Sequence, residues 1–326
     1  MAKKVIFVGG TSYSGSTFFH LTLANDPAGF AVGEVQHLFA PTKERHLRST
    51  WKCGCGDPSC DFWDRVKKRG VEALYETIFE LNPEVDFIVD SSKNVVWTAE
   101  HSERLARRGI EVERVLIWKT PLEFAHSLKK RNRLGEGEGL ANWPRYHRLF
   151  YSFMDEWRAI KYSEYTNDQA PVLTAVCDYL GIPYFPGKER FWEKTHHVLG
   201  GNLSSRIHLY SQNSSNYQEV QRRAAGGNRE LAGVEARHRQ VYYEDPDQQE
   251  LRELVDRLRA DVPQVDQIEE MLLNFDVRSQ TERRQWPQLA LSPAEKRLVQ
   301  VRQHTKVRWG KLRFGFKNWQ VEKQRS

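Results

Sequence analysis

The sequence lacks any run of eighteen apolar residues, although 39% of its 326 residues are hydrophobic. A membrane-spanning helix needs about 20 apolar residues in succession, so we do not expect the chain to cross a bilayer. The first residues, MAKKVIFVGG, enter an apolar strand too early for the long apolar segment of a signal peptide. These absences predict a soluble cytoplasmic protein.

A large excess of charge of one sign is also missing. The formal net charge is +6, and much of that excess lies in residues 306–325. A modest positive charge favours anionic ligands in general, and we expect no nucleic-acid partner. The basic tail KVRWGKLRFGFKNWQ alternates apolar with charged residues. This pattern leaves open a surface hairpin, a partner-binding segment, or a contact with a membrane surface or polyanion.

The segment IFVGGTSYSGSTFF lacks a lysine where a nucleotide-binding loop would carry one. Gly10 and Gly15 have the spacing of a phosphate-binding loop, but Ser16 stands directly after Gly15. In nucleoside triphosphatases the lysine at this position contacts the β- and γ-phosphates. Because the sequence also shows no clear acidic ligand for magnesium, a kinase-like nucleotide enzyme becomes the weaker alternative.

The same segment nevertheless has the other features of an anion site. A turn between a strand and a helix presents backbone N–H groups, and the helix N-terminus adds a partial positive charge. Ser14, Ser16 and Thr17 add hydroxyl groups. We therefore predict a phosphate loop, with a simple helix-capping turn as the alternative.

Cysteine is scarce, and three of the four cysteines lie close together in WKCGCGDPSCDFW. Cys53, Cys55 and Cys60 provide three metal ligands without a clear fourth, although His46 lies nearby in the sequence. Three interpretations stay open: a structural loop with free thiols, a metal site, or a redox pair. The fourth cysteine, Cys177, has the surroundings of a small buried helix residue.

The order of apolar and polar segments predicts an α/β fold of the P-loop type, with three layers and a central parallel sheet flanked by helices. Strands are expected at 3–10, 87–93 and 112–121, each followed by a helical segment. Ligands of such sheets bind beyond the carboxyl ends of the strands, where these three segments carry polar residues. Residues 142–181 show a helical pattern, and 196–202 a loop.

The remainder of the chain predicts additions to one domain. Residues 211–240 are polar and predict an exposed insert, and amphipathic helices follow near 250–262 and 267–277. We predict an α/β domain over 1–280 and a basic C-terminal extension over 281–326.

Several segments together resemble sulfotransferases that use 3′-phosphoadenosine 5′-phosphosulfate (PAPS). SYSGSTFF, followed by NDPAGFAVGEV, is similar to the loop of that family that binds the 5′-phosphosulfate. KTPLEFAHS has a cation, a proline and a serine at the family's 3′-phosphate positions. VDSSK, CGCGDPSCDFW and HHVLGGN are similar to segments of bacterial and carbohydrate-type members. The resemblance covers roughly residues 3–207.

The resemblance implies transfer of a sulfuryl group from PAPS, without a metal, to a hydroxyl or amine of a carbohydrate, lipid or small molecule. Glu34 would take the proton of the acceptor, and Lys93 would contact the bridging or sulfuryl oxygens; the alternatives are a loop carboxylate and a surface lysine. The implied donor-binding residues are Ser12, Tyr13, Ser14, Gly15, Ser16, Thr17, Phe18, Lys119, Ser127, Asn202 and Arg206.

The sequence departs from the family pattern at three places. Tyr13 replaces a basic residue, which removes a charge near the phosphosulfate, and Lys93 is the candidate to compensate. Lys119 and Thr120 stand where the family has arginine and aspartate, so the charge is kept without a bidentate fork. The family's later Tyr-Glu-Asp segment is reduced to KYSEYTND. A non-catalytic homologue acting as a binding protein is therefore a further alternative.

Overall fold

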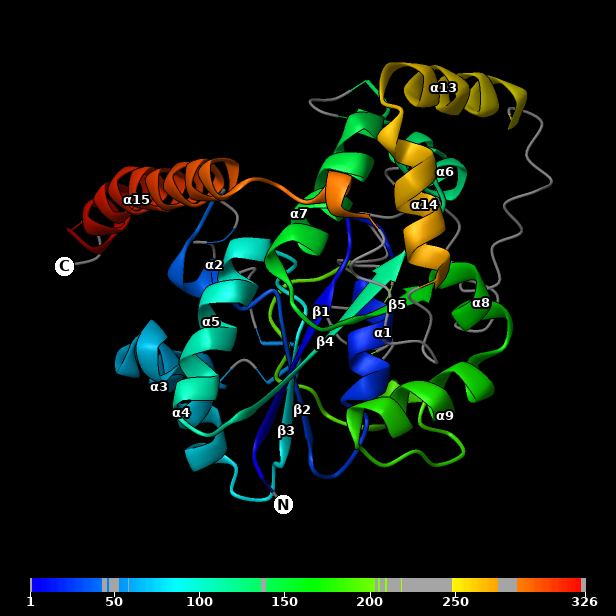
Figure 1. Ribbon diagram of the computed structural model, residues 1–326. Helices are drawn as coiled ribbons and strands as arrows, with labels where there is room; N and C mark the ends of the chain where they lie inside the picture. Colours follow the sequence, from blue (N-terminus) through cyan, green and yellow to red (C-terminus); the bar gives the residue numbers. More distant parts are fainter. Residues whose placement is uncertain are drawn as a thin grey trace.

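A five-stranded parallel sheet forms the centre of the molecule (Figure 1). The computed structural model describes residues 2–42, 46, 53–57, 59–135, 139–202, 205, 209, 218, 248–274 and 286–323. The strands lie in the order β2-β3-β1-β4-β5. Their bounds are β1 Lys4–Gly9, β2 Gly29–Gly33, β3 Phe87–Asp90, β4 Glu111–Trp118 and β5 Arg158–Lys161. The predicted α/β fold with a central parallel sheet is confirmed.

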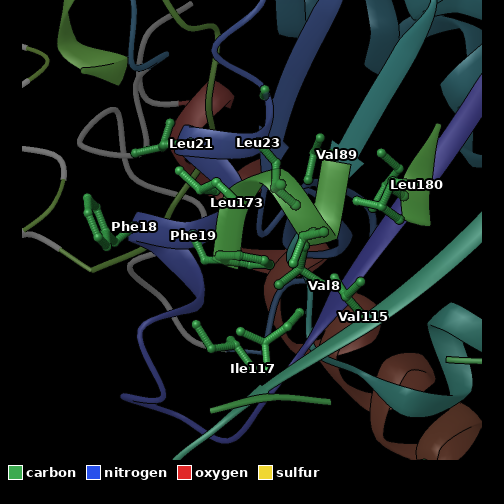
Figure 2. Close-up of a cluster of buried hydrophobic side chains, with 14 of the residues drawn as sticks. Val8, Phe18, Phe19, Leu21, Leu23, Val89, Val115, Ile117, Leu173 and Leu180 are labelled. Atoms are coloured by element: carbon green, nitrogen blue, oxygen red, sulfur yellow. The ribbon is translucent and has the colours of Figure 1, made fainter. Parts of the chain in front are cut away.

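Both faces of the sheet are covered, because successive side chains of a strand point to opposite faces and both sets are apolar. In β1, Ile6 and Val8 belong to one buried cluster and Val5 and Phe7 to another. Figure 2 shows the first cluster, in which side chains of β1, β3 and β4 meet those of α1 and α9. The sheet is therefore the middle of three layers.

The helices of the α/β core are those expected from alternating strands and helices. On the face of Figure 2 lie α1 Ser16–Leu23, α8 Tyr162–Asn167 and α9 Gln169–Leu180. On the other face lie α3 Phe62–Arg69, α4 Leu74–Leu81, α5 Val95–Arg107 and α7 Asn142–Phe153. The short α2, Gln36–Phe39, follows β2, and α6, Pro121–Lys129, follows β4.

Two strands, β2 and β5, were not among the three that the sequence predicts. β2 is the five-residue segment GFAVG, in which two glycines weaken any strand pattern. β5 is only four residues long, and its sequence RAIK begins and ends with a cation. The prediction of a continuous helical pattern over 142–181 is therefore wrong at Arg158–Lys161. These two segments form strands because β2 pairs with β3 and β5 pairs with β4.

Two helices of the core carry local signals at their ends. Thr120 accepts a hydrogen bond from the backbone of Glu123, whose carboxylate accepts one from the backbone of Thr120, so a reciprocal cap starts α6. Gly181 ends α9 in the left-handed conformation, at φ 59°. Cys177 is buried in α9, as predicted.

The C-terminal part of the described chain is helical. α13 Gln248–Asp261 and α14 Gln264–Asn274 confirm the two predicted amphipathic helices and pack near α6 and α7. α15, Pro293–Lys323, follows and lies beside α5 (Figure 1). The hairpin alternative for the tail is therefore wrong, since the segment is one long helix.

The predicted insert over 211–240 lies, except for residue 218, outside the described residues. The division at residue 280 stays a prediction, because 275–285 also lie outside them. None of the helices in the described parts of the chain combines the length and apolar character that crossing a bilayer requires.

Candidate functional site

The polar residues predicted to bind ligand gather at one edge of the sheet. β1, β2, β3 and β4 are parallel, so their carboxyl ends lie on the same side. The predicted phosphate loop, residues 10–17, follows β1, and Glu34 follows β2. Lys93 follows β3 by three residues, and Lys119 follows β4 directly. β1 and β4 are neighbours whose connections run to opposite sides, which is the position where α/β sheets bind ligands.

The phosphate loop has a tight backbone that only particular residues allow. Gly10 and Gly15 have φ values of 147° and 95°. A Cβ atom on Gly10 would lie 2.4 Å from the Ser14 hydroxyl oxygen and 2.6 Å from the Ile117 carbonyl oxygen. A Cβ atom on Gly15 would meet the ring of Tyr162 at 2.2 Å. The two glycines identified from the sequence are therefore needed for the shape of the loop.

Hydroxyl groups of this loop are available to an anion. The Oγ of Ser14 is buried and has no hydrogen-bond partner among the described residues, and an unsatisfied buried hydroxyl is costly. A phosphate or phosphosulfate oxygen would satisfy it. Ser16 and Thr17 are buried at the start of α1, whereas Ser12 is exposed. These residues fit an anion held without a lysine in the loop.

Of the other predicted donor-binding residues, Phe18 lies in the hydrophobic core and Asn202 lies against the phosphate loop. The ring of Phe18 lies in the core, 5.7 Å from the ring of Phe191, so its side chain is structural (Figure 2). The backbone N–H of Asn202 donates to the hydroxyl of Thr17 at 2.9 Å, which brings the predicted loop over 196–202 onto the phosphate loop. Arg206 lies outside the described residues, so its predicted role stays a prediction.

The two residues predicted to act in catalysis form an ion pair. The Lys93 Nζ atom lies 2.7 Å from Oε1 of Glu34, and the two side chains are 18% and 19% exposed. Glu34 is also fixed through its backbone, because its N–H donates to the carbonyl of Leu199 at 2.7 Å. The structure thus brings the two residues together, 59 positions apart in the sequence.

The backbone at Lys93 is strained. Its φ value is 63°, a left-handed conformation that costs a residue other than glycine about 1 kcal/mol or more. Asp90, at the end of β3, holds the turn by accepting hydrogen bonds from Tyr75, Trp97 and the backbone of Ser92. Burial raises the pKa of Asp90. Positive φ outside glycine occurs in only two other described residues, Tyr13 and Asn132.

Tyr146 joins the phosphate loop to the Lys93 turn. Its hydroxyl accepts a hydrogen bond from the backbone N–H of Gly10 and donates one to the carbonyl of Lys93, both at 2.9 Å. The sequence pattern over 142–181 indicates only a helix around Tyr146. Trp143 and Tyr151 of the same helix are core residues. No sequence signal distinguishes Tyr146 from them.

Lys119 is a buried cation next to the predicted serine. Its Nζ atom donates to the Ser127 hydroxyl at 3.0 Å and lies 4.1 Å from the centre of the Tyr162 ring. Only 5% of Lys119 is exposed, and this burial lowers its pKa to about 7. A neighbouring phosphate would stabilise the ammonium form. The spacing of Lys119 and Ser127 in the sequence thus corresponds to a real contact.

Arg131 places a positive charge beside Tyr13, which replaces the basic residue of the family pattern. The guanidinium carbon of Arg131 lies 4.4 Å from the centre of the Tyr13 ring, within range of a cation–π interaction. The same guanidinium donates to the carbonyl of Ser127 at 2.8 Å. Nothing in the sequence pattern pairs Arg131 with Tyr13. Lys93, considered as the compensating charge, is engaged with Glu34 instead.

His20 is a buried histidine of α1 that the sequence analysis did not select. Its Nδ1 atom donates to the carbonyl of Ser16 at 3.0 Å. Burial lowers the pKa of His20 to about 3, and the neighbouring His196 and Lys93 lower it by smaller amounts. The ring is therefore neutral at physiological pH and adds no charge to the site.

No family model and no curated protein matches the chain. Solved structures do match. The sulfotransferase domain from the curacin biosynthetic pathway is 14% identical, covers 78% of this chain and 98% of that one, and has a TM-score of 0.43. The sulfotransferase domain of the Synechococcus PCC 7002 olefin synthase is 14% identical over 78% and 94% of the two chains, with a TM-score of 0.41. A sulfotransferase from Alicyclobacillus acidocaldarius is 13% identical over 71% and 98%, with a TM-score of 0.38.

Proposed function

We propose that this protein is a sulfotransferase that moves a sulfuryl group from PAPS to a hydroxyl or amine of a carbohydrate, lipid or small-molecule acceptor. The observation that carries the proposal is the pairing of Glu34 with Lys93 at the same sheet edge as the phosphate loop and Lys119. A base, a cation for the leaving group and two anion sites are the parts that this reaction needs.

The donor carries two separate anionic groups, and the site offers two separate places for them. The phosphate loop would supply to the phosphosulfate its backbone N–H groups and the Ser14 hydroxyl, which has no partner within the described part of the chain. Lys119 and Ser127 supply a buried ammonium and a hydroxyl for the 3′-phosphate. Asn202, which contacts Thr17 through its backbone, would close over the nucleotide.

Sulfuryl transfer forms a bond between the acceptor oxygen or nitrogen and sulfur while the bond from sulfur to the bridging oxygen breaks. Glu34 would accept the proton that the acceptor loses. The leaving group, 3′-phosphoadenosine 5′-phosphate, gains negative charge, and Lys93 would stabilise it. Because Lys93 pairs with Glu34, a donor anion that attracts Lys93 would free the carboxylate for the acceptor.

The runner-up function, a kinase-like nucleotide enzyme, is less well supported. It needs an acidic ligand for magnesium near the phosphate loop. Asp90, at the end of the neighbouring strand β3, is the acidic residue placed to serve as that ligand. Its carboxylate, however, is engaged by three hydrogen bonds from the protein. The phosphate loop also has Ser16 in place of lysine. A non-catalytic homologue that only binds the nucleotide is the other alternative.

Calorimetry with two nucleotides tests the proposal. We expect 3′-phosphoadenosine 5′-phosphate to bind without metal and more tightly than ATP with magnesium. Preference for ATP with magnesium would overturn the proposal in favour of the kinase-like alternative. A screen with labelled PAPS against sugars, phenols and lipids then separates a transferase from a protein that only binds the nucleotide.

We also propose that α15 contacts an anionic membrane surface. Leu298 and Trp309 are eleven residues apart, which is three helical turns, so they share one face of the helix. They are 50% and 68% exposed, and Val301 and Leu312 on that face are 53% and 60% exposed. Exposed cations flank this face at Arg302, Lys306 and Arg308. An apolar face bordered by cations suits the headgroup region of an anionic bilayer.

A further inference from the structure

The cysteine loop and a distant histidine form a compact group of four metal-ligand atoms. The Sγ atoms of Cys53, Cys55 and Cys60 and a ring nitrogen of His197 all lie within 4.8 Å of one another. Nδ1 of His197 is 3.2 Å from the sulfur of Cys53 and 3.5 Å from that of Cys60. Residues from two segments more than 130 positions apart therefore point at one centre.

We infer that Cys53, Cys55, Cys60 and His197 bind one zinc ion. Zinc prefers four tetrahedral ligands of nitrogen and sulfur in its structural sites. Bonds of about 2.3 Å to sulfur and about 2.0 Å to nitrogen separate the ligand atoms by roughly 3.5–3.8 Å. The two measured distances from His197 to sulfur lie close to that separation. Iron–sulfur clusters, in contrast, need ligands spread around a larger unit of several atoms.

The surroundings of His197 hold its ring in the orientation that this site requires. The ring stacks parallel to Phe30, with centres 6.0 Å apart and an interplanar angle of 3°, and it lies 4.9 Å from the ring of Phe62. The carbonyl of His197 accepts a hydrogen bond from the indole of Trp63 at 2.6 Å. Supporting contacts that fix a ligand histidine are a regular part of metal sites.

The backbone of the cysteine loop is shaped to approach the histidine segment. The N–H of Gly54 donates to the carbonyl of Val198 at 2.9 Å. A Cβ atom on Gly54 would lie 2.3 Å from a methyl group of Val198, so glycine is required there. Gly56 adopts φ 80° and turns the chain between Cys55 and the third cysteine. These features place the thiols without help from a disulfide.

His46, considered from the sequence as a fourth ligand, has another partner. Its ring lies 4.0 Å from the ring of His37, and its Nδ1 atom accepts a hydrogen bond from the backbone of Thr42 at 3.1 Å. The fourth ligand is therefore His197, which the sequence pattern could not reveal because of the long separation. Of the three interpretations left open for the cysteines, the geometry favours a metal site.

A zinc ion at His197 would hold in place the segment from His197 to Asn202, which borders the proposed donor site. His197 is followed by Leu199, which pairs with Gly33 at the end of β2 and accepts a hydrogen bond from the backbone of Glu34. The same segment continues to Asn202 and its contact with Thr17. Zinc at His197 would therefore stabilise the position of residues on both sides of the donor site. With four protein ligands, a tetrahedral zinc would have no open position for a substrate, so its role would be structural.

Binding would convert three thiols to thiolates and release their protons to solvent as zinc enters. The experiment uses the full chain, expressed with zinc and purified without chelators. We expect about one zinc per chain by elemental analysis. We also expect four titratable thiols after unfolding without reductant, because none of the cysteines is oxidised. Replacement of zinc by cobalt(II) should give the intense visible bands of a tetrahedral site and thiolate-to-cobalt charge-transfer absorption.

Variants identify the ligands. Cys53→Ser, Cys55→Ser, Cys60→Ser and His197→Gln should each weaken zinc binding by at least about tenfold, and the cysteine variants should lose part of the charge-transfer absorption. Cys177→Ala and His46→Gln are the matched controls and should keep the wild-type zinc content. A chelator added to the wild-type chain should lower its Tm by about 5 °C or more, which tests the site without any substitution.

Several results would overturn the inference. One is a reduced wild-type chain that fails to take up zinc or to give the tetrahedral cobalt spectrum. A second is two missing thiols in the freshly purified protein, which would indicate a disulfide and the redox interpretation. A third is unchanged zinc content in all four ligand variants. Metal content does not depend on the proposed sulfotransferase function, so the two proposals fail separately.

Discussion

The ammonium of Lys93 lies 2.7 Å from the carboxylate of Glu34, at the carboxyl edge of the sheet. Each residue neutralises the charge of the other, so neither offers its full charge to a ligand in this arrangement. In the proposed function, a donor anion would compete for Lys93, and its arrival would expose the carboxylate. The pair would then link donor binding to the availability of the proposed base.

Glu34→Gln should remove turnover and keep nucleotide binding. The amide has nearly the shape of the carboxylate but cannot take the proton of the acceptor, so we expect the rate to fall by about 10²–10⁴-fold. Transfer from labelled PAPS measures the rate, and calorimetry with 3′-phosphoadenosine 5′-phosphate measures binding. Glu103→Gln, which removes an exposed carboxylate paired with Arg107, is the control. Turnover equal to wild type would remove Glu34 from the mechanism.

Lys93→Ala and Lys93→Gly should lose activity alike but differ in stability. Both remove the cation, whereas only glycine adopts φ 63° without strain. We expect the glycine variant to be more stable than the alanine variant by about 1 kcal/mol, measured by urea unfolding. Equal stability of the two variants would show that the left-handed backbone at Lys93 carries no strain.

Binding of the 3′-phosphate should weaken as the pH rises above about 7. Burial lowers the pKa of Lys119 to about 7 in the ligand-free chain, and a phosphate binds its protonated form. The phosphate is already a dianion in this range, so we expect up to about a tenfold loss of affinity per pH unit for 3′-phosphoadenosine 5′-phosphate. In Lys119→Ala this dependence should be absent. A parallel pH dependence in that variant would contradict the assignment.

Lys119→Ala should also discriminate between nucleotides. Loss of a charge-assisted contact is worth about 1.5–3 kcal/mol, or roughly 10–100-fold in affinity for 3′-phosphoadenosine 5′-phosphate. Adenosine 5′-phosphosulfate has no 3′-phosphate and should lose much less. Lys129→Ala, at the end of the helix that follows Lys119 and paired with Glu250, is the matched control. Equal losses for both nucleotides would place Lys119 elsewhere in the site.

Arg131→Ala should weaken nucleotide binding, because Arg131 is the cation that lies over Tyr13. We expect a loss of about 5–30-fold by calorimetry, in line with a partly desolvated cation–π partner and a nearby charge. Adding Tyr13→Lys to Arg131→Ala should restore part of the affinity by returning a charge to the loop. Arg133→Ala, an exposed neighbour, serves as control and should change little. No recovery in the double variant would argue against electrostatic compensation.

The proposed membrane contact of α15 predicts binding to vesicles that contain anionic lipid and not to neutral vesicles. Trp309→Ala with Leu312→Ala should abolish co-sedimentation, because both exposed side chains are removed from one helix face. The control is Leu273→Ala, which removes an exposed apolar side chain from α14 and should leave vesicle binding unchanged. Binding to heparin but not to vesicles would favour a soluble polyanion as the partner.

The central strands, and the position of the candidate residues at one edge of the sheet, could be predicted because their signals are local. β1 and β3 are nearly uniform apolar segments followed by small polar residues, and Lys119 and Ser127, eight residues apart, belong to one strand–helix unit. β2 and β5 could not be predicted, since they are short and depend on pairing with neighbouring strands.

Contacts between residues far apart in the sequence could not be predicted either. The Tyr13–Arg131 stacking joins residues more than a hundred positions apart, and the same is true of Cys53 and His197. Nothing in the local pattern selects Arg131 over Arg133, or His197 over His196. The sequence thus provides the residue types of a site, while the packing of distant segments decides which of them meet.

The hydroxyl of Tyr146 touches both the phosphate loop and the Lys93 turn, at Gly10 and at the carbonyl of Lys93. One phenol oxygen therefore sets the spacing between the segment that would hold the donor and the segment that presents the cation. The two loops cannot shift independently while both hydrogen bonds persist. A shift of the phosphate loop would therefore be passed by Tyr146 to the backbone of Lys93, whose side chain holds the Glu34 carboxylate.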